Sequence, residues 1–203
     1  AAYSFSEGLA AVKDGNKWGY IDKRGKTVIA AQYEDAGSFS SGLAAVQMNA
    51  KWGYISKSGK LVIAPSFDSA APFAERLAAV KTGGLWGYIN KTGELLIEPQ
   101  FTDARIFSHG LAPVKIGAVW TYVDKTGQIV IHTGYEEASS FSEGLAAVKM
   151  GGRWGYINSI GNIVINVQFW EAQPFGEGLA AVSMYNKWGY IDKNGIFIGN
   201  LTN

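Results

Sequence analysis

Two histidines, His109 and His132, are the residues of this chain best suited to acid–base chemistry near neutral pH. A hydrolytic centre would also need a nucleophile and an orienting group, and a metal centre would need three or four converging ligands. The sequence has no cysteine, no Gly-x-Ser-x-Gly elbow and no phosphate-binding loop pattern. We therefore interpret both histidines as solvated loop residues, and we expect no catalytic residue, no metal site and no cofactor.

The candidate binding residues are those that break an internal repeat. Arg105, His109 and His132 fall in its fourth copy, and the other copies carry different residue types at these places. Trp170 is the fourth candidate, because the matching residues of the other copies are polar: Glu34, Asp68, Thr102 and Glu136. An aromatic side chain at a polar position favours a contact surface. Local repacking is the alternative explanation of all four departures.

The repeat itself has a period of 34 residues and accounts for nearly the whole chain. A tryptophan marks each of its six copies: Trp18, Trp52, Trp86, Trp120, Trp154 and Trp188. Such a period is typical of solenoids, propellers and arrays. Tetratricopeptide repeats have the same period, but two glycine-bearing turns per copy leave no helix long enough to pack.

Each copy reads as a set of short antiparallel strands separated by turns. In the first copy the expected strands cover residues 9–13, 17–22 and 26–30, with a short fourth strand within residues 32–36. Trp18 and Tyr20 share one face of the second strand, and Gly19 lies on the other face, because side chains alternate along a strand.

Units of this size cannot bury both faces of a sheet alone, so we expect neighbouring units to stack. The aromatic face of one unit would cover the glycine-bearing face of the next, and Gly19 would leave a hole for the rings. All six repeat tryptophans should then be largely buried, and Trp170 should be more exposed than they are.

The units, written G-L-A-A-V…K-W-G-Y-I-D-K-x-G…V-I-x-P-x-F, resemble the bacterial WG-repeat family, also called KWG repeats. The resemblance extends over essentially the whole chain in six copies that keep the same register. It implies β-structure, and it implies that such repeats often accompany a signal peptide or another domain. It brings no catalytic residues with it.

We predict an all-β fold and a single repeat domain over residues 1–203, with units centred on the six tryptophans. A closed six-bladed propeller-like ring is favoured over an open β-solenoid or superhelix, because neither end unit has the polar cap that an open stack needs. In a ring the chain would be a monomer, and Ala1 would lie next to Asn203.

Composition and charge exclude some classes of function. The net charge is +1 with no basic patch, which argues against nucleic acid, and no apolar run is long enough to insert into a membrane. We predict a non-enzymatic module that presents a repeated β surface to a protein or glycan partner. The alternatives are a cryptic hydrolase or lyase site in the fourth unit and a purely structural spacer. A chain that starts without Met favours the cell envelope or secretion over the cytoplasm, as after removal of a signal peptide.

Overall fold

The computed structural model describes residues 1–202, and in these residues every regular element is a β-strand. The expected all-β fold is therefore confirmed. The chain divides into two compact units, residues 1–100 and 101–203, and each is described by itself. Among the described residues no helix has the length and apolarity needed to cross a membrane.

The first unit carries β1 to β11. Their bounds are β1 Leu9–Asp14, β2 Lys17–Asp22, β3 Thr27–Tyr33, β4 Asp35–Ala36, β5 Leu43–Met48, β6 Lys51–Ser56, β7 Leu61–Phe67, β8 Ser69–Ala70, β9 Ala78–Thr82, β10 Leu85–Ile89 and β11 Leu95–Phe101. The last residue of β11 falls just beyond the boundary between the two units.

The second unit carries β12 to β23. Their bounds are β12 Asp103–Ala104, β13 Ala112–Ile116, β14 Val119–Val123, β15 Ile129–Tyr135, β16 Glu137–Ala138, β17 Ala146–Met150, β18 Arg153–Ile157, β19 Ile163–Phe169, β20 Glu171–Ala172, β21 Ala180–Met184, β22 Lys187–Ile191 and β23 Phe197–Thr202.

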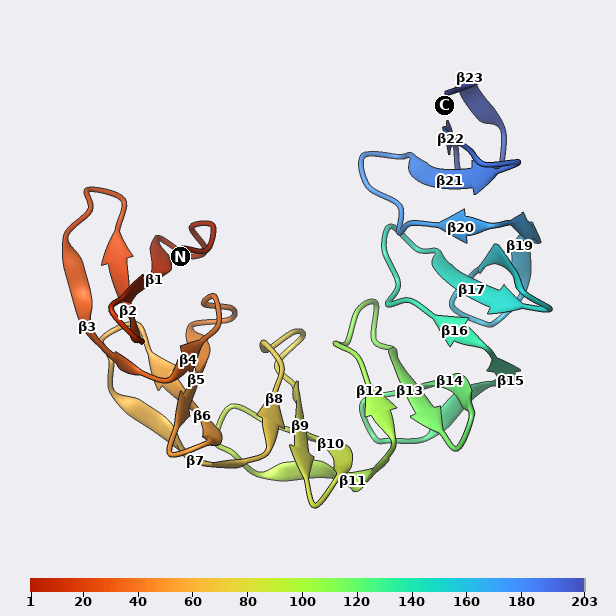
Figure 1. Ribbon diagram of the computed structural model, residues 1–203. Coiled ribbons are helices and arrows are strands. Elements are labelled where there is room, and N and C mark those ends of the chain that lie inside the picture. The colour runs from red at the N-terminus through yellow and green to blue at the C-terminus, as the bar shows by residue number, and fades with distance from the viewer. Residues whose placement is uncertain (203) are drawn as a thin grey trace. The chain divides into compact units, whose positions relative to one another are not determined.

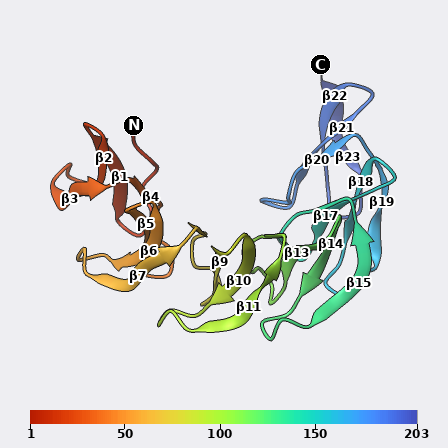
Figure 2. The ribbon, with the colours of Figure 1, turned by 60° about the horizontal axis from the view of Figure 1, so that its bottom comes forward.

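These strands form six small antiparallel sheets, one for each copy of the repeat (Figure 1). Five sheets have four strands, in the order of β4-β5-β6-β7, and the first has the order β1-β2-β3. In the first sheet a single bridge from Ala2 to Val12 takes the place of the two-residue edge strand. Figure 2 shows the three long strands of a sheet, for example β13, β14 and β15, side by side from a second direction.

The short fourth strand expected within residues 32–36 was predicted for the wrong copy of the repeat, because it belongs to the following sheet. The chain leaves one sheet at Tyr33, and after Glu34 it begins the next sheet as β4, which pairs with β5 through Asp35↔Gln47. One residue thus separates the last strand of a sheet from the first strand of the following sheet. Such a short link leaves little freedom between successive sheets of a unit.

The central hairpin of each sheet closes with a two-residue turn. Asn49 and Ala50 join β5 to β6 with φ values of 51° and 59°, and Gly83 and Gly84 have the same role between β9 and β10. Positive φ at both turn residues matches the right-handed twist of the flanking strands. The hairpin register is therefore set locally in these copies.

The glycine that follows the repeat tryptophan does not make a hole for a neighbouring ring. A Cβ on Gly53 would lie 2.5 Å from the Ile63 oxygen and 2.7 Å from the Pro65 nitrogen, both in β7 of the same sheet. The register of β6 and β7 shifts between Trp52 and Tyr54, so β7 bulges over this glycine. The predicted role of the glycine was wrong, because the space above it belongs to its own sheet.

The predicted pairing of faces is nevertheless confirmed within the first unit. Trp18 and Tyr20 of the first sheet pack with Val46 and Ile55 on the glycine-bearing face of the second sheet. Burial of these apolar groups holds successive sheets together. The second unit repeats the arrangement between its own sheets.

The tyrosine two residues after the tryptophan also binds the next sheet. Tyr20 is completely buried, its ring centroid lies 4.9 Å from that of Phe39, and its hydroxyl donates to the Gly37 oxygen at 2.8 Å. Burial raises the pKa of this hydroxyl. Tyr156 makes the same hydrogen bond to the Gln173 oxygen in the second unit.

The prediction that all six repeat tryptophans are largely buried is only partly correct. Trp18 and Trp120 are 7% and 3% exposed, whereas Trp188 is 38% exposed. The remaining three are half-buried: Trp52, Trp86 and Trp154. Trp170 is 50% exposed, more than any of the six, as predicted.

Candidate functional site

Glu7 joins its sheet to the next one through polar contacts that we call the latch. These contacts explain why a glutamate recurs at this position. Glu7 Oε2 accepts a hydrogen bond from the Gly42 nitrogen at 3.0 Å and pairs with Lys57 Nζ at 3.1 Å. Lys57, and then the backbone of Gly42, hold the pKa of the Glu7 carboxyl below its usual range against the opposing effect of burial. In the second unit Glu143 makes the same contacts with Gly178 and Lys193.

His109 occupies the glutamate position of this latch. Ser159 stands where the matching lysine would be, so both charged partners are replaced together. His109 is exposed, has a φ of 54° in a turn, and its Nδ1 lies 3.0 Å from Ser108 Oγ. The geometry is that of a modified turn, and the imidazole remains open to solvent.

Arg105 covers the repeat tryptophan of its own sheet. Its guanidinium carbon lies 4.7 Å from the ring centroid of Trp120, and Nη2 lies 3.5 Å from the Glu137 carboxylate. Stacking of a guanidinium on an indole combines apolar contact with attraction to the ring electrons. Trp120 is the most buried of the repeat tryptophans as a result.

The residue at this covering position sets how far each tryptophan is exposed. In the first sheet Tyr3 takes the position, and its ring lies parallel to that of Trp18 with centroids 4.9 Å apart. The other copies carry shorter or uncharged residues there: Gly37, Ala71, Ser139 and Gln173. The tryptophans of those four copies are the ones that remain half-buried or exposed.

Trp170 has a local explanation in the structure. The guanidinium carbon of Arg153 lies 3.2 Å from its ring centroid, and the matching contact in the first sheet is an ion pair between Lys17 and Glu34. An aromatic–cation contact has thus replaced an acid–base contact. The indole is still half exposed.

His132 lies exposed on β15, in the bulge that folds over Thr121. Thr121 stands in the glycine position, and its hydroxyl donates to the Ile131 oxygen. The contacts described for Arg105, His109 and Trp170 go to different partners, and none of these contacts joins two of the four candidates. Among the described residues no group of three or more His, Cys, Asp and Glu side chains could hold a metal ion.

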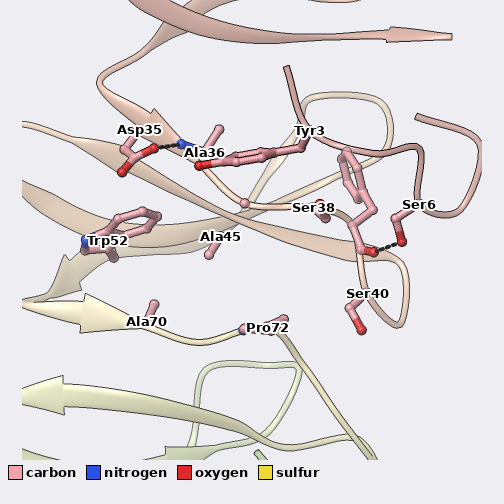
Figure 3. Close-up of a pocket in the computed structure, with 12 residues that line it drawn as sticks. Tyr3, Ser6, Asp35, Ala36, Ser38, Ser40, Ala45, Trp52, Ala70 and Pro72 are labelled. Atoms are coloured by element: carbon pink, nitrogen blue, oxygen red, sulfur yellow. Dashed lines mark hydrogen bonds between the residues drawn. The ribbon is translucent and has the colours of Figure 1, made fainter. Parts of the chain in front are cut away.

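Sequence reasoning missed a hollow in the first unit. Its volume is about 500 Å³, and Trp52, Asp35 and Tyr3 project into it together with Ser38 (Figure 3). The hollow opens beside Trp52, where Gly37 supplies no side chain to cover the indole. Gly37, which has no side chain at the position where two other copies carry Tyr3 and Arg105, was the signal that could have found it.

Comparison with known families identifies the repeat. The family described as "WG containing repeat" matches residues 1–18, 18–52, 52–86, 86–120, 120–154 and 154–188. The chain belongs to the WG-containing repeat family. None of the curated proteins compared with the chain matches it.

Solved structures of similar fold are very distant in sequence. BamB from Moraxella catarrhalis has a TM-score of 0.62 at 11% identity, and the match covers 96% of this chain and 71% of that one. A eukaryotic initiation factor has a TM-score of 0.64 at 12% identity, with 98% and 64% covered. Hsv2 from Kluyveromyces lactis scores 0.61 at 10% identity, with 94% and 72% covered. The likeness is to β-propellers and shows the fold alone.

The tryptophan and the glycine of the WG motif therefore have separate structural roles. The glycine gives the bulged strand of its own sheet room to approach, as Gly53 does beneath Pro65. The tryptophan packs towards the next sheet, and the residue at the covering position decides how much of its ring reaches solvent. The tryptophan position of this chain is thus structural, and in some copies part of the ring is exposed to solvent.

Proposed function

We propose that this WG-repeat chain is a non-enzymatic interaction module that presents a repeated β surface to a protein or glycan partner. The observation that carries the proposal is the graded exposure of the tryptophans within each unit, from 3% at Trp120 to the half-buried Trp52, Trp86 and Trp154. A constant indole with a variable cover gives each sheet a different local surface on the same framework. Tryptophan and arginine are also the residues that dominate binding energies at interfaces.

The four sequence candidates belong to the proposed binding surface. Arg105, His109, His132 and Trp170 all lie in the second unit, and each is exposed. Arg105 and Trp170 combine exposure with a fixed orientation, because the first stacks on Trp120 and the second is stacked by Arg153. Preorganised side chains lose less entropy on binding, which favours these two as contact residues.

A hydrolase or lyase site in the fourth unit receives little support. Ser108 Oγ and His109 Nδ1 are 3.0 Å apart, but nucleophilic catalysis also requires a group that orients the imidazole and donors for the developing oxyanion. The pair lies in a turn with an exposed imidazole, where water would compete for both groups. We therefore propose that the chain catalyses no reaction.

A variant that covers two tryptophans tests the interaction proposal. Gly37→Arg and Ala71→Arg together copy the cover that Arg105 gives to Trp120. Peptide and glycan arrays probed with the wild-type protein should show specific binding, and the double variant should lose at least part of it while melting at the same temperature. The proposal fails if the wild type binds no member of either array, or if it turns over an ester, phosphoester, glycoside or peptide substrate.

We also propose that the six sheets close into a ring, as a monomer. Tyr190 is 56% exposed, whereas its counterpart Tyr156 is buried against Phe175 with the ring centroids 4.9 Å apart. Phe5 is 47% exposed, whereas its counterpart in the second sheet, Phe39, is 1% exposed. In a closed ring Phe5 would pack on Tyr190, which would restore the contact seen between successive sheets within each unit.

The latch residues support closure in the same way. Glu177 follows Glu143 by one period, and Lys23 precedes Lys57 by one period. Closure would therefore bring Glu177 and Lys23 into the relationship that Glu7 has with Lys57. The expected proximity of Ala1 to Asn203 belongs to the same proposal, and Asn203 lies outside the described residues. That residues 1–203 act as one domain also remains our proposal.

A further inference from the structure

The hollow beside Trp52 has features of a built site. It lies wholly within the first unit and has a volume of about 500 Å³, within the range of small-ligand pockets. The Trp52 indole and the Asp35 carboxylate lie towards one end of it, and Ser6 and Ser40 towards the other (Figure 3). An aromatic face next to a carboxylate suits a flat group that carries positive charge or hydrogen-bond donors.

The chain fills the equivalent place itself in two other sheets. Over Trp18 it puts the phenol ring of Tyr3, and over Trp120 it puts the guanidinium of Arg105. Both groups are flat, and the guanidinium is also paired with the Glu137 carboxylate. The place over Trp52 differs because its covering residue is Gly37.

Asp35 supplies the negative charge in this hollow. Its Oδ1 accepts a hydrogen bond from the Ala36 nitrogen at 2.8 Å, which fixes the carboxylate, and within the described part of the chain no donor is seen at Oδ2. The residue that matches Glu137 in this copy is Ser69, so the acid of this hollow is Asp35 from the sheet of Trp52 itself, whereas Arg105 pairs with Glu137 of the following sheet. A group stacked on Trp52 would therefore meet its counter-ion at Asp35.

We infer that the hollow binds a guanidinium group, supplied by an arginine side chain of a protein partner that stacks on Trp52 and pairs with Asp35. This inference rests on the proposed interaction function and names the chemistry that one of its surfaces recognises. Lysine would fit less well, because its ammonium is strongly hydrated and cannot stack as a plane. A sugar ring could also lie on the indole, but it would leave the charge of Asp35 without a counter-ion.

The direct test uses small probes on the intact chain. Nα-acetyl-arginine amide, Nα-acetyl-lysine amide and maltotriose are titrated separately while the indole N–H signal of Trp52 is followed by nuclear magnetic resonance. The signal is assigned with Trp52→Phe. The arginine probe should shift it saturably and bind about tenfold more tightly than the lysine probe, and maltotriose should leave it unchanged.

Two substitutions separate the site from the fold. Gly37→Arg copies Arg105 into the hollow, and the glycine has room for it, since an added Cβ would lie 3.7 Å from the Ala45 oxygen. It should abolish the shift. Asp35→Asn keeps the shape and the acceptor for Ala36, and should weaken binding of the arginine probe about fivefold to tenfold, the scale of one charge-assisted hydrogen bond.

Asp103→Asn is the matched control. Asp103 accepts the same local hydrogen bond, from the Ala104 nitrogen at 2.8 Å, but does not line the hollow. It should leave affinity for the arginine probe unchanged. If it weakens binding as much as Asp35→Asn does, the effect of Asp35 is not local and the inference is overturned.

The remaining outcomes are also decisive. A shift of the Trp52 signal by maltotriose but not by arginine would assign the hollow to a glycan and overturn the inference. No shift with any probe would overturn it as well. If array binding by the wild type nevertheless persists and is reduced by Ala71→Arg alone, the interaction function stands and only the arginine assignment fails.

Discussion

The recurrent side chains of each copy work across the boundary between sheets. Tyr122 is an example, since it is fully buried and its hydroxyl donates to the Ser139 oxygen of the next sheet at 2.8 Å. Tyr122→Phe leaves that oxygen without its donor and should lower the free energy of unfolding by about 1–2 kcal/mol. Chemical denaturation measures the change. Tyr185→Phe, at a residue that is 78% exposed, should have no effect, and an equal loss in both variants would contradict this role.

The latch carboxylates predict a dependence of stability on pH. The pKa of Glu7 is held below its usual range, chiefly by Lys57, so its contribution to stability is present above the unfolded-state pKa and is lost as pH falls through the lower folded-state pKa. Glu7→Gln should therefore melt at a lower temperature than the wild type at neutral pH, and the two curves should converge in acid.

Thermal melts between pH 7 and pH 3 measure this convergence. Glu98→Gln is the control, since Glu98 is an exposed residue on the bulge of β11. A gap between Glu7→Gln and the wild type that stays constant down to pH 3 would show that Glu7 acts by packing rather than by charge.

The roles of many individual residues could be predicted from the sequence, because a residue type that recurs at the same position of every copy must make a recurring contact. The exposure of Trp170 followed from this logic. The sequence could not reveal which residue accompanies or contacts each residue that breaks the repeat. Arg153 contacts Trp170 although the two residues are 17 positions apart, because β18 and β19 pair with Trp154 opposite Phe169. His109 and Ser159, which together replace the charged residues of the latch, are 50 positions apart in the chain.

At the scale of the sheet, the decisive feature is the bulge that covers the WG glycine. Gly53→Ala would force its Cβ to within 2.5 Å of the Ile63 oxygen, a backbone atom that can move only if β7 shifts. We expect a loss of about 1–3 kcal/mol in the free energy of unfolding, the usual cost of overpacking. Denaturant titration provides the measurement.

Gly176→Ala is the matched control for this substitution. A Cβ on Gly176 would meet no atom within 4 Å, and its backbone does not need the left-handed region. It should unfold within about 0.5 kcal/mol of the wild type, as surface substitutions usually do. If Gly53→Ala is equally harmless, the bulge is not what fixes the glycine.

Strand positions could be predicted from alternation and turn residues, but the bulge and the assignment of the short strand could not. The third strand was expected to end at residue 30, whereas β3 runs on to Tyr33 and crosses to the next sheet after Glu34. Ala30, Ala31 and Gln32 carry no turn signal, because their irregular path is set by the strand they fold against. The hole proposed at Gly19 failed for this reason.

At the scale of the whole molecule, the proposed closure would make the two ends interdependent. Tyr190→Phe is then expected to cost as much as Tyr122→Phe, about 1–2 kcal/mol, because its hydroxyl would donate to the first sheet. In an open array the same substitution would leave the free energy of unfolding unchanged, since this ring would remain exposed. Chemical denaturation of the two variants compares them directly.

Closure also bears on the binding surface. In a ring all six covering positions would belong to one molecule with a fixed spacing between tryptophans, so that a partner could contact several of them at once. In an open array no contact between the first and last sheets would fix that spacing. The affinity of a partner with several arginines would then gain less from multivalency, because linked sites reinforce one another only when geometry permits simultaneous contact.

The most direct test of closure is a distance between the two latch residues that closure would join. The sequence has no cysteine, so spin labels can be placed at Lys23→Cys and Glu177→Cys alone. The control is the pair Glu7→Cys and Lys57→Cys, whose native side chains are already 3.1 Å apart. Pulsed electron resonance on the monomer should give the same short distance for both pairs. A short distance for the control pair with a much longer one for the Lys23–Glu177 pair would contradict the ring.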